Sequence, residues 1–266
     1  MFKLIPTTLI ACAAFAFSAH AATITLDFEA AIEGEIVSDG TSSNPAYSGI
    51  GITALNTGGG PNYAVAYNSE GAIGRDSDLE ENRYASKFTR ANDGTTGHTG
   101  FGNVLVVQEN SWGCSDGICN YADDEAGGGA LRFSFDKVHQ VKSFDYFDID
   151  GIPDQQAESI IVKLFTNQNF DWSDSVNGSD VFLVDGVLST GGDNTFRTHA
   201  LTNPQFVYGI EFVFTSSGAI DNIVLETLEN TADIPALASL PVFLVGLVGI
   251  KLISRRKKSA ATTAKT

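Results

Sequence analysis

Acidic side chains stand at both ends of the strand-rich part of the sequence, where they could supply oxygen ligands to a metal ion. Asp27 and Glu29 lie at the end of the first alternating segment, and Asp221 lies in the last one. Calcium takes about six to eight oxygens from carboxylates and carbonyls, and the first and last strands of a β-sandwich are often neighbours. We therefore predict a structural calcium shared by Asp27, Glu29 and Asp221. The alternative is that Asp221 and Asn222 only cap or turn the strand.

A second acidic segment runs from Asp145 to Gly151 and contains Asp148 and Asp150. On a strand these two carboxylates point to the same side, and Asp-x-Asp-Gly imitates the start of a calcium loop. The residues that follow do not supply the other EF-hand ligands in register, so we reject that motif. Asp148 and Asp150 stay candidate calcium ligands, with a solvated strand end as the alternative.

Two cysteines, Cys114 and Cys119, remain once an N-terminal segment containing Cys12 is set aside. An even pair suits an oxidising compartment, and two cysteines without nearby histidines cannot build a structural zinc site. We predict a local disulfide that shapes a surface loop presenting Trp112 and Tyr121.

Catalytic motifs do not support an enzyme. The sequence contains no Gly-x-Ser-x-Gly elbow, no His-Glu-x-x-His and no phosphate loop, and His98, His139 and His199 are scattered. The prediction is a non-enzymatic protein. The alternative is a membrane-anchored extracellular hydrolase of polysaccharides, because two of the many carboxylates could face each other across a cleft.

The fold is predicted from a succession of short alternating or β-branched runs with glycine, asparagine, aspartate and serine between them. No internal window shows a convincing helical period. The expected strands are 23–28, 104–107, 131–135, 138–148, 159–165, 181–184, 206–214 and 220–225. This pattern predicts an all-β fold, an antiparallel β-sandwich of jelly-roll type.

The acidic residues at the two ends of this domain resemble those of extracellular jelly-roll domains and carbohydrate-binding modules, in which such residues share a structural calcium. We predict an exopolysaccharide or other glycan as partner, because exposed aromatic rings stack on sugars. Trp112, Tyr121 and Trp172 are the candidates, and each could equally be a core residue.

The N-terminus has the three-part pattern of a signal peptide. Lys3 precedes an apolar stretch from Leu9 to Phe17, and Ala19 and Ala21 form a small-x-small cleavage site. We predict cleavage after Ala21 and export. An uncleaved anchor is disfavoured because the apolar core is too short to span a bilayer.

The C-terminal segment combines prolines, an apolar run and a basic end. The run from Leu237 to Ile250 is shorter than the roughly 20 residues of a usual transmembrane helix, but Lys251 can snorkel and Leu252 and Ile253 extend it. The basic cluster Arg255–Lys258 is expected to stay cytoplasmic, which places the rest outside.

This tail resembles the PEP-CTERM class of bacterial sorting signals, in its VPLPA-CTERM variant. The matching residues are Pro235, Ala238, Ser239, Leu240 and Pro241, with Ile234 a conservative match, while Ala236 and Leu237 depart from the pattern. The resemblance covers about the last thirty residues. It implies an exosortase-type processing enzyme as partner, in a Gram-negative bacterium that makes exopolysaccharide. An ordinary C-terminal anchor is the alternative.

The predicted organisation is a signal peptide (1–21), a β-sandwich domain (22–226), a spacer (227–233), a sorting signal with a transmembrane helix (234–258) and a disordered cytoplasmic tail (259–266). The formal charge is −16, and all 32 acidic residues precede the sorting signal. Such a surface repels nucleic acid. We therefore expect a protein first held in the inner membrane and then at the cell surface or in the exopolysaccharide matrix.

Overall fold

Short runs of β-branched and aromatic residues, separated by glycine-rich turns, form the elements of this protein. The computed structural model describes residues 22–38, 45–71, 79–80, 88–90, 95, 98–149, 159–173, 180–188 and 195–227. Within these ranges all regular structure is β, apart from one 3-10 turn, η1 (Pro45–Tyr47). Residues 21–228 make up one compact unit.

The strands described are β1 (Thr23–Leu26), β2 (Ile50–Asn56), β3 (Ala64–Asn68), β4 (Thr89–Arg90), β5 (Asn103–Val107), β6 (Cys114–Ser115), β7 (Ile118–Cys119), β8 (Gly129–Phe147), β9 (Ile160–Phe165), β10 (Val181–Leu188), β11 (Thr195–Ala200), β12 (Phe206–Phe214) and β13 (Ala219–Thr227).

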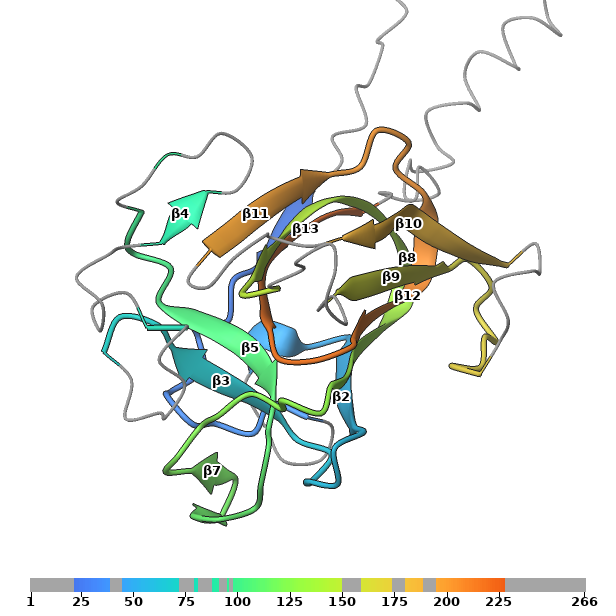
Figure 1. Cartoon of the computed structure of the whole chain (residues 1–266). Helices are drawn as coiled ribbons and strands as arrows, with labels where there is room; N and C mark the ends of the chain where they lie inside the picture. Colours follow the sequence, from blue (N-terminus) through green and yellow to red (C-terminus); the bar gives the residue numbers. More distant parts are fainter. Residues whose placement is uncertain are drawn as a thin grey trace, which may run out of the picture. The chain divides into compact units, whose positions relative to one another are not determined.

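The long strand β8 organises the sheet. Its first part pairs with β2 on one side and β12 on the other, and its second part pairs mainly with β13 and β11. The main path of hydrogen-bonded strands is β10-β9-β12-β8-β13-β5-β3, with β1 added to β13. The sheet curves strongly around the middle of the molecule (Figure 1). One half contains β2, the start of β8, β12, β9 and β10, and the other contains the end of β8, β13, β5 and β3.

Pairing is antiparallel throughout the described strands, except between the short β4 and β11. Register shifts interrupt the β8–β12 and β8–β13 ladders. Such irregularities bend a strand and increase its twist, which lets β8 serve both halves of the sheet.

The larger apolar cluster fills the inner side of the curved sheet. It includes Phe133 and Phe144 of β8, Phe212 of β12 and Ile220 of β13, all with no measurable exposure. Phe212 lies edge-on to both Phe133 and Phe144, at centroid distances of 5.9 and 5.1 Å. These rings therefore join the two parts of β8 to one core.

A second apolar cluster lies on the other side of β3, β5 and β13. Along β5, Leu105 and Val107 belong to the larger cluster, while Val104 and Val106 belong to this one. Burial on both faces explains why β5 is an unbroken apolar run instead of an alternating one.

The all-β antiparallel prediction is thus confirmed, and a sandwich-like arrangement fits it. Among the residues described, no helix is long and apolar enough to cross a membrane. The predicted signal peptide with Ala19 and Ala21, and the predicted sorting signal from Pro235 to Pro241 with its helix, lie outside the described residues.

Candidate functional site

Two buried carboxylates face each other where β13 pairs with β8. Asp221 is the direct partner of Asp145 in the strand register. The Nδ2 of Asn222 donates hydrogen bonds to Oδ2 of both carboxylates, at 2.9 Å each. Asn222 has φ 49°, at the register shift of this ladder, and asparagine tolerates that left-handed conformation better than most residues. The irregularity places one amide between two acids.

The predicted partners from the N-terminal strand lie in the same region. Because β1 pairs with β13 through Leu26 and Ile223, the chain leaves β1 beside this irregularity. The backbone N–H of Glu29 donates to Oδ1 of Asp27 at 3.3 Å. Oε1 of Glu29 accepts from the backbone N–H of Asn103 at 2.8 Å.

Burial dominates the electrostatics of this cluster. Burial, together with the smaller effects of the nearby charges of Asp145, Glu29 and Asp27, raises the pKa of Asp221 to about 9, against a hydrogen bond from the Asn222 backbone. Burial also raises the pKa of Asp145, while hydrogen bonds from Thr198 and Asn222 oppose the shift. Asp221 is 1 % exposed, and its Oδ1 is buried without a hydrogen-bond partner.

The cluster has the right ligand type for calcium but not a ready-made cage. Among the described His, Cys, Asp and Glu side chains, no three are grouped so that they could hold a metal ion. Calcium binding would require the carboxylates to draw together around the unpartnered Oδ1 of Asp221. Asp145, which the sequence analysis did not assign to this site, is the carboxylate paired with Asp221 in the strands.

The other predicted acidic candidates do not join this cluster in the same way. Asp148 is 3 % exposed, has φ 53°, and its backbone N–H donates to the carbonyl of Thr195 at 2.9 Å. Asp150 lies outside the described residues.

The predicted disulfide is present and closes a tight hairpin. Cys114 and Cys119 are bonded, and they pair across β6 and β7. Asp116 and Gly117 connect the two strands with φ 52° and 82°, as the preferred Asp-Gly hairpin turn requires. The hairpin docks on the chain at Gly34, whose carbonyl accepts from the N–H of Cys119 at 2.7 Å. A Cβ on Gly34 would lie 2.1 Å from the Cys119 carbonyl oxygen, so the contact needs glycine.

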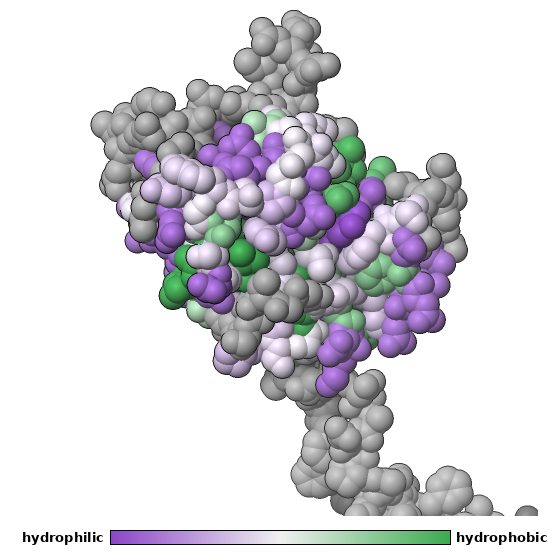
Figure 2. Space-filling model, turned by 90° about the horizontal axis from the view of Figure 1, so that it is seen from below, coloured by the Kyte–Doolittle hydropathy of each residue, from purple (hydrophilic) through white to green (hydrophobic). Residues whose placement is uncertain are grey.

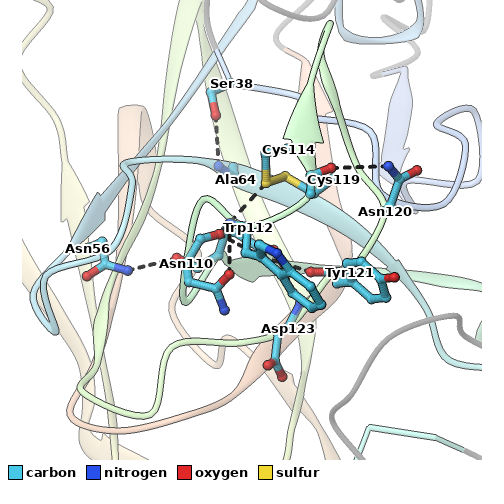
Figure 3. The surroundings of a disulfide bond; sticks show 12 residues. Ser38, Asn56, Ala64, Asn110, Trp112, Cys114, Cys119, Asn120, Tyr121 and Asp123 are labelled. Carbon is cyan, nitrogen blue, oxygen red and sulfur yellow. Dashed lines mark hydrogen bonds between the residues drawn. A yellow bond between two sulfur atoms is a disulfide. The ribbon is translucent and has the colours of Figure 1, made fainter.

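An aromatic pair stands beside this hairpin (Figure 3). The rings of Trp112 and Tyr121 are stacked, with centroids 4.5 Å apart and an interplanar angle of 8°. Trp112 is 57 % exposed. Gly113, with φ 75°, lets the backbone pass under the pair, because a Cβ there would lie 2.8 Å from the Tyr121 ring.

A buried glutamine fixes the loop that carries the pair. Nε2 of Gln108 donates to the carbonyls of Asn110 and Tyr121, at 3.0 and 2.9 Å. Its Oε1 accepts from the N–H of Asp123 at 3.2 Å. Gln108 has no measurable exposure, so these bonds form away from competing water. Both ends of the loop are therefore hydrogen-bonded to the Gln108 side chain. No sequence motif indicated this role of Gln108.

A hollow of about 720 Å³ adjoins this loop, lined by Gly58–Pro61, Glu109–Ser111 and Glu125. Asn56 holds its rim: Oδ1 accepts from the N–H groups of Gly59 and Gly60 at 2.8 and 2.9 Å, and Nδ2 donates to Glu125. The hollow is open and polar, and the exposed ring of Trp112 follows directly after Ser111.

The three histidines of the domain pack against phenylalanines. His98 lies near Phe196, with centroids 5.2 Å apart; His139 lies near Phe135 at 4.9 Å, and His199 near Phe144 at 5.3 Å. His139 lies on β8 and His199 on β11, whereas His98 forms an isolated bridge with Phe88.

Comparisons with known proteins add little to this geometry. No protein-family model matches the sequence, and a comparison with curated proteins finds no match. One matching solved structure is CpGH89CBM32-6 produced by Clostridium perfringens, with 8 % identity over 38 % of this chain and 70 % of that one. Its TM-score of 0.23 is too low to identify a shared fold or function.

The buried acids predict an unusual pH dependence. With a folded pKa of about 9, Asp221 keeps a proton that it loses in the unfolded chain above pH ~4. Raising the pH between these values therefore favours unfolding, by up to about 1.4 kcal/mol per pH unit. We expect urea denaturation in the presence of a chelator to show this decline, and Asp221→Asn to flatten it. The exposed control, Asp136→Asn, should leave the slope unchanged. A wild-type protein whose stability rises from pH 5 to pH 8 would contradict the assignment.

Proposed function

We propose that this protein is an exported, non-enzymatic bacterial protein of the cell surface or exopolysaccharide matrix, whose jelly-roll β-sandwich binds glycan. The observation that carries this proposal is the exposed Trp112 stacked on Tyr121. Burying a tryptophan inside the domain would yield more stability than leaving over half of it in water. A rigid, exposed ring can stack on the apolar face of a sugar, and the polar hollow beside it can accept the sugar's hydroxyl groups.

The surface of the molecule also supports a hydrophilic ligand. On the face seen in Figure 2, hydrophobic residues form small separate patches among hydrophilic ones. Large protein interfaces are usually marked by broader apolar patches. The disulfide, Gln108 and Gly113 preorganise the Trp112 loop, so little conformational entropy is lost when a ligand binds.

A polysaccharide hydrolase is the second candidate, and one observation bears on it. Two carboxylates, Glu109 and Glu125, line the hollow beside Trp112. Both oxygens of Glu125 already accept hydrogen bonds, from the Asn56 side chain and from the N–H of Gly127. Glu125 thus holds the loop together, and the buried pair Asp145 and Asp221 is closed to a substrate, at 8 % and 1 % exposure. Binding without cleavage is the better supported activity.

The glycan proposal predicts that Trp112→Ala weakens binding to the exopolysaccharide of the native cells by about two- to tenfold, because an aromatic contact is worth about 0.5–1.5 kcal/mol. Affinity electrophoresis through gels that contain the polysaccharide measures this. Trp112→Phe, which keeps a ring, should retain most of the affinity. Equal retardation of wild type and Trp112→Ala would contradict the role of Trp112, and release of reducing ends by the wild type would favour the hydrolase.

Calcium is proposed as a structural cofactor at Asp27, Glu29, Asp145 and Asp221. The cation would neutralise acids that otherwise repel one another and would supply the missing partner of Asp221 Oδ1. We expect calcium at about a hundredfold above its Kd to raise the Tm by about 5–10 °C at pH 8. The rise should disappear in Asp221→Asn and persist in Asp136→Asn. An unchanged wild-type Tm with calcium would refute the site.

The sorting proposal rests on the sequence of the tail. We propose that the protein is exported by its signal peptide, held by the C-terminal helix in the inner membrane, and processed by an exosortase-type enzyme. Mass spectrometry of protein from membrane, surface and released fractions of native cells should show a mature chain beginning at Ala22 and ending near Pro235–Pro241. An intact C-terminus in the membrane fraction would instead identify a plain anchor.

A further inference from the structure

A row of charged residues crosses the outer face of the sheet half formed by β2, β8, β12, β9 and β10. Glu211 of β12 is the strand partner of Arg132 on β8 and of Lys163 on β9. Its Oε1 accepts from Arg132 Nε at 2.8 Å, and its Oε2 accepts from Lys163 Nζ at 2.7 Å. The Glu211 side chain is 2 % exposed, whereas Arg132 and Lys163 are 21 % and 24 % exposed. The cations therefore reach the surface while the carboxylate holds them in place.

The chain after β9 folds back over this face and brings a second tryptophan to it. Phe170 covers Gly209, where a Cβ would lie 2.5 Å from the phenyl ring. Trp172 lies edge-on to Phe165 and Phe170, at centroid distances of 5.0 and 4.6 Å. The guanidinium carbon of Arg132 lies 5.4 Å from the centre of the Trp172 ring. Trp172 is therefore fixed by three neighbours beside the charged row.

These residues line a groove of about 470 Å³. Ala130 and Val213 are apolar lining residues, and Trp172, Arg132, Lys163 and Glu211 are the ring and polar groups. Glu211 accepts hydrogen bonds from Nε of Arg132 and from one N–H of the Lys163 ammonium group. The guanidinium and ammonium carry further N–H groups that can donate to a ligand, while the ring offers an apolar surface. This combination suits a sugar ring with acceptor hydroxyls.

The charged residues in and beside the groove bear on whether a neutral or an anionic sugar fits it. Arg132 and Lys163 are balanced by Glu211 and by Asp171, whose pKa is lowered by hydrogen bonds from the backbone and side chain of Ser173 and by the Arg132 charge. The charged lining residues Arg132, Lys163 and Glu211 sum to +1, and Asp171, which lies outside the lining but feels the Arg132 charge, offsets this single charge in a chain of formal charge −16. A polyanion would be repelled by the chain and would gain no compensating charge in the groove, so a neutral glycan fits best.

The groove and the hollow beside Trp112 share one rim. Thr57 and Gly127 line the groove, while Gly58, next to Thr57, and Glu125, two residues before Gly127, line the hollow. Thr57 Oγ1 donates to the carbonyl of Gly127 at 3.1 Å, which joins the two loops of the rim. A Cβ on Gly127 would lie 2.6 Å from Cα of Gly58, so the rim is narrow because both residues are glycines.

We propose that Trp172 and Trp112 mark the two ends of one binding track for a neutral polysaccharide, which runs through the groove, over the Thr57–Gly127 rim and into the hollow. This inference rests on the proposed glycan binding and adds its ligand class and its extent. A chain of sugar units spans the track, whereas a single sugar fills only one end. Affinity therefore rises with chain length, because each occupied end adds contacts without a second loss of translational freedom.

The test uses the folded exported domain with neutral polymers (galactomannan, xyloglucan and dextran) and with alginate as the uronate polymer. Affinity electrophoresis identifies the polymer retained, and calorimetry then follows oligosaccharides of that polymer from the monomer upward. We expect a neutral polymer to be retained, affinity to increase with length, and Trp172→Ala and Trp112→Ala each to weaken binding of the polymer by about tenfold, or about 1.4 kcal/mol. Phe206→Ala removes an exposed ring outside both hollows and should change nothing.

A second groove variant guards against a folding defect in Trp172→Ala. Val213→Phe fills the groove from its lining and leaves Trp172 in place. It should weaken polymer binding about as much as Trp172→Ala does, with an unchanged Tm. Retention of no glycan by the wild type would overturn the proposed function itself. Loss of binding in Trp112→Ala alone, with both groove variants binding normally, would overturn the track and leave the proposed function standing. Retention of alginate alone, or equal affinity for monomer and oligomers, would also overturn the track.

Discussion

The continuous strand β8 is the constraint on which the rest of this structure depends. Its 19 residues cross from one half of the curved sheet to the other, so its side chains belong to both. Phe133 packs into the core from the first half and Phe144 from the second, and both contact Phe212. Arg132 and Asp145 face the opposite side of the same strand. One strand thus fixes the core, the charged row of the groove and the buried acidic pair relative to one another.

The acidic pair is costly, and its surroundings show how the fold tolerates it. Two carboxylates paired across strands and removed from water cannot both stay ionised without compensation. Asn222 provides one amide for both, at the cost of a left-handed backbone conformation and a broken register. Such a device is unnecessary for stability alone, because apolar residues on the same outer face of β8 and β13, such as Phe147 and Ala219, pack well. The cost of burying these acids is the physical reason for proposing a calcium ion there.

The alternation of apolar residues in the sequence predicted most strands of the larger core. It failed for strands in which small or charged residues interrupt that alternation. The runs around β5, β9, β12 and β13 are rich in valine, isoleucine and phenylalanine and were predicted closely. Strand β3, Ala64–Asn68, was not predicted. The residues that it turns toward the larger core are two alanines, which are too small to give an apolar alternation in the sequence. Strand β8 was predicted as two strands, because Asp136 and Lys137 are exposed at its bend and interrupt the apolar pattern.

The candidate sites differ in the same way: residues close in the sequence could be predicted to lie together, and residues far apart in the sequence could not. The disulfide follows from two cysteines close in sequence, and the placement of Asp27 and Glu29 in the region of Asp221 follows from the pairing of the first and last strands, although no three of the described acids are grouped as a metal site. The groove has no such signal, because Arg132, Lys163 and Glu211 come from three strands far apart in the chain. In the sequence, Glu211 is a single charge in an otherwise apolar strand. Nothing near it in the chain indicates that it pairs with two cations from other strands.

The buried Glu211 also explains why the groove can be both firm and open. A carboxylate at 2 % exposure is stable only with partners, and removing either cation would leave an uncompensated charge. Arg132 and Lys163 are therefore held at fixed positions even before a ligand arrives, and Trp172 is held by its contacts with Arg132 and two phenylalanines. Side chains fixed in this way lose little conformational freedom on binding, which would favour the proposed contacts with neutral hydroxyls. The pairing of Glu211 with two cations on the outer face of the sheet thus leaves the groove lining with a formal charge of only +1.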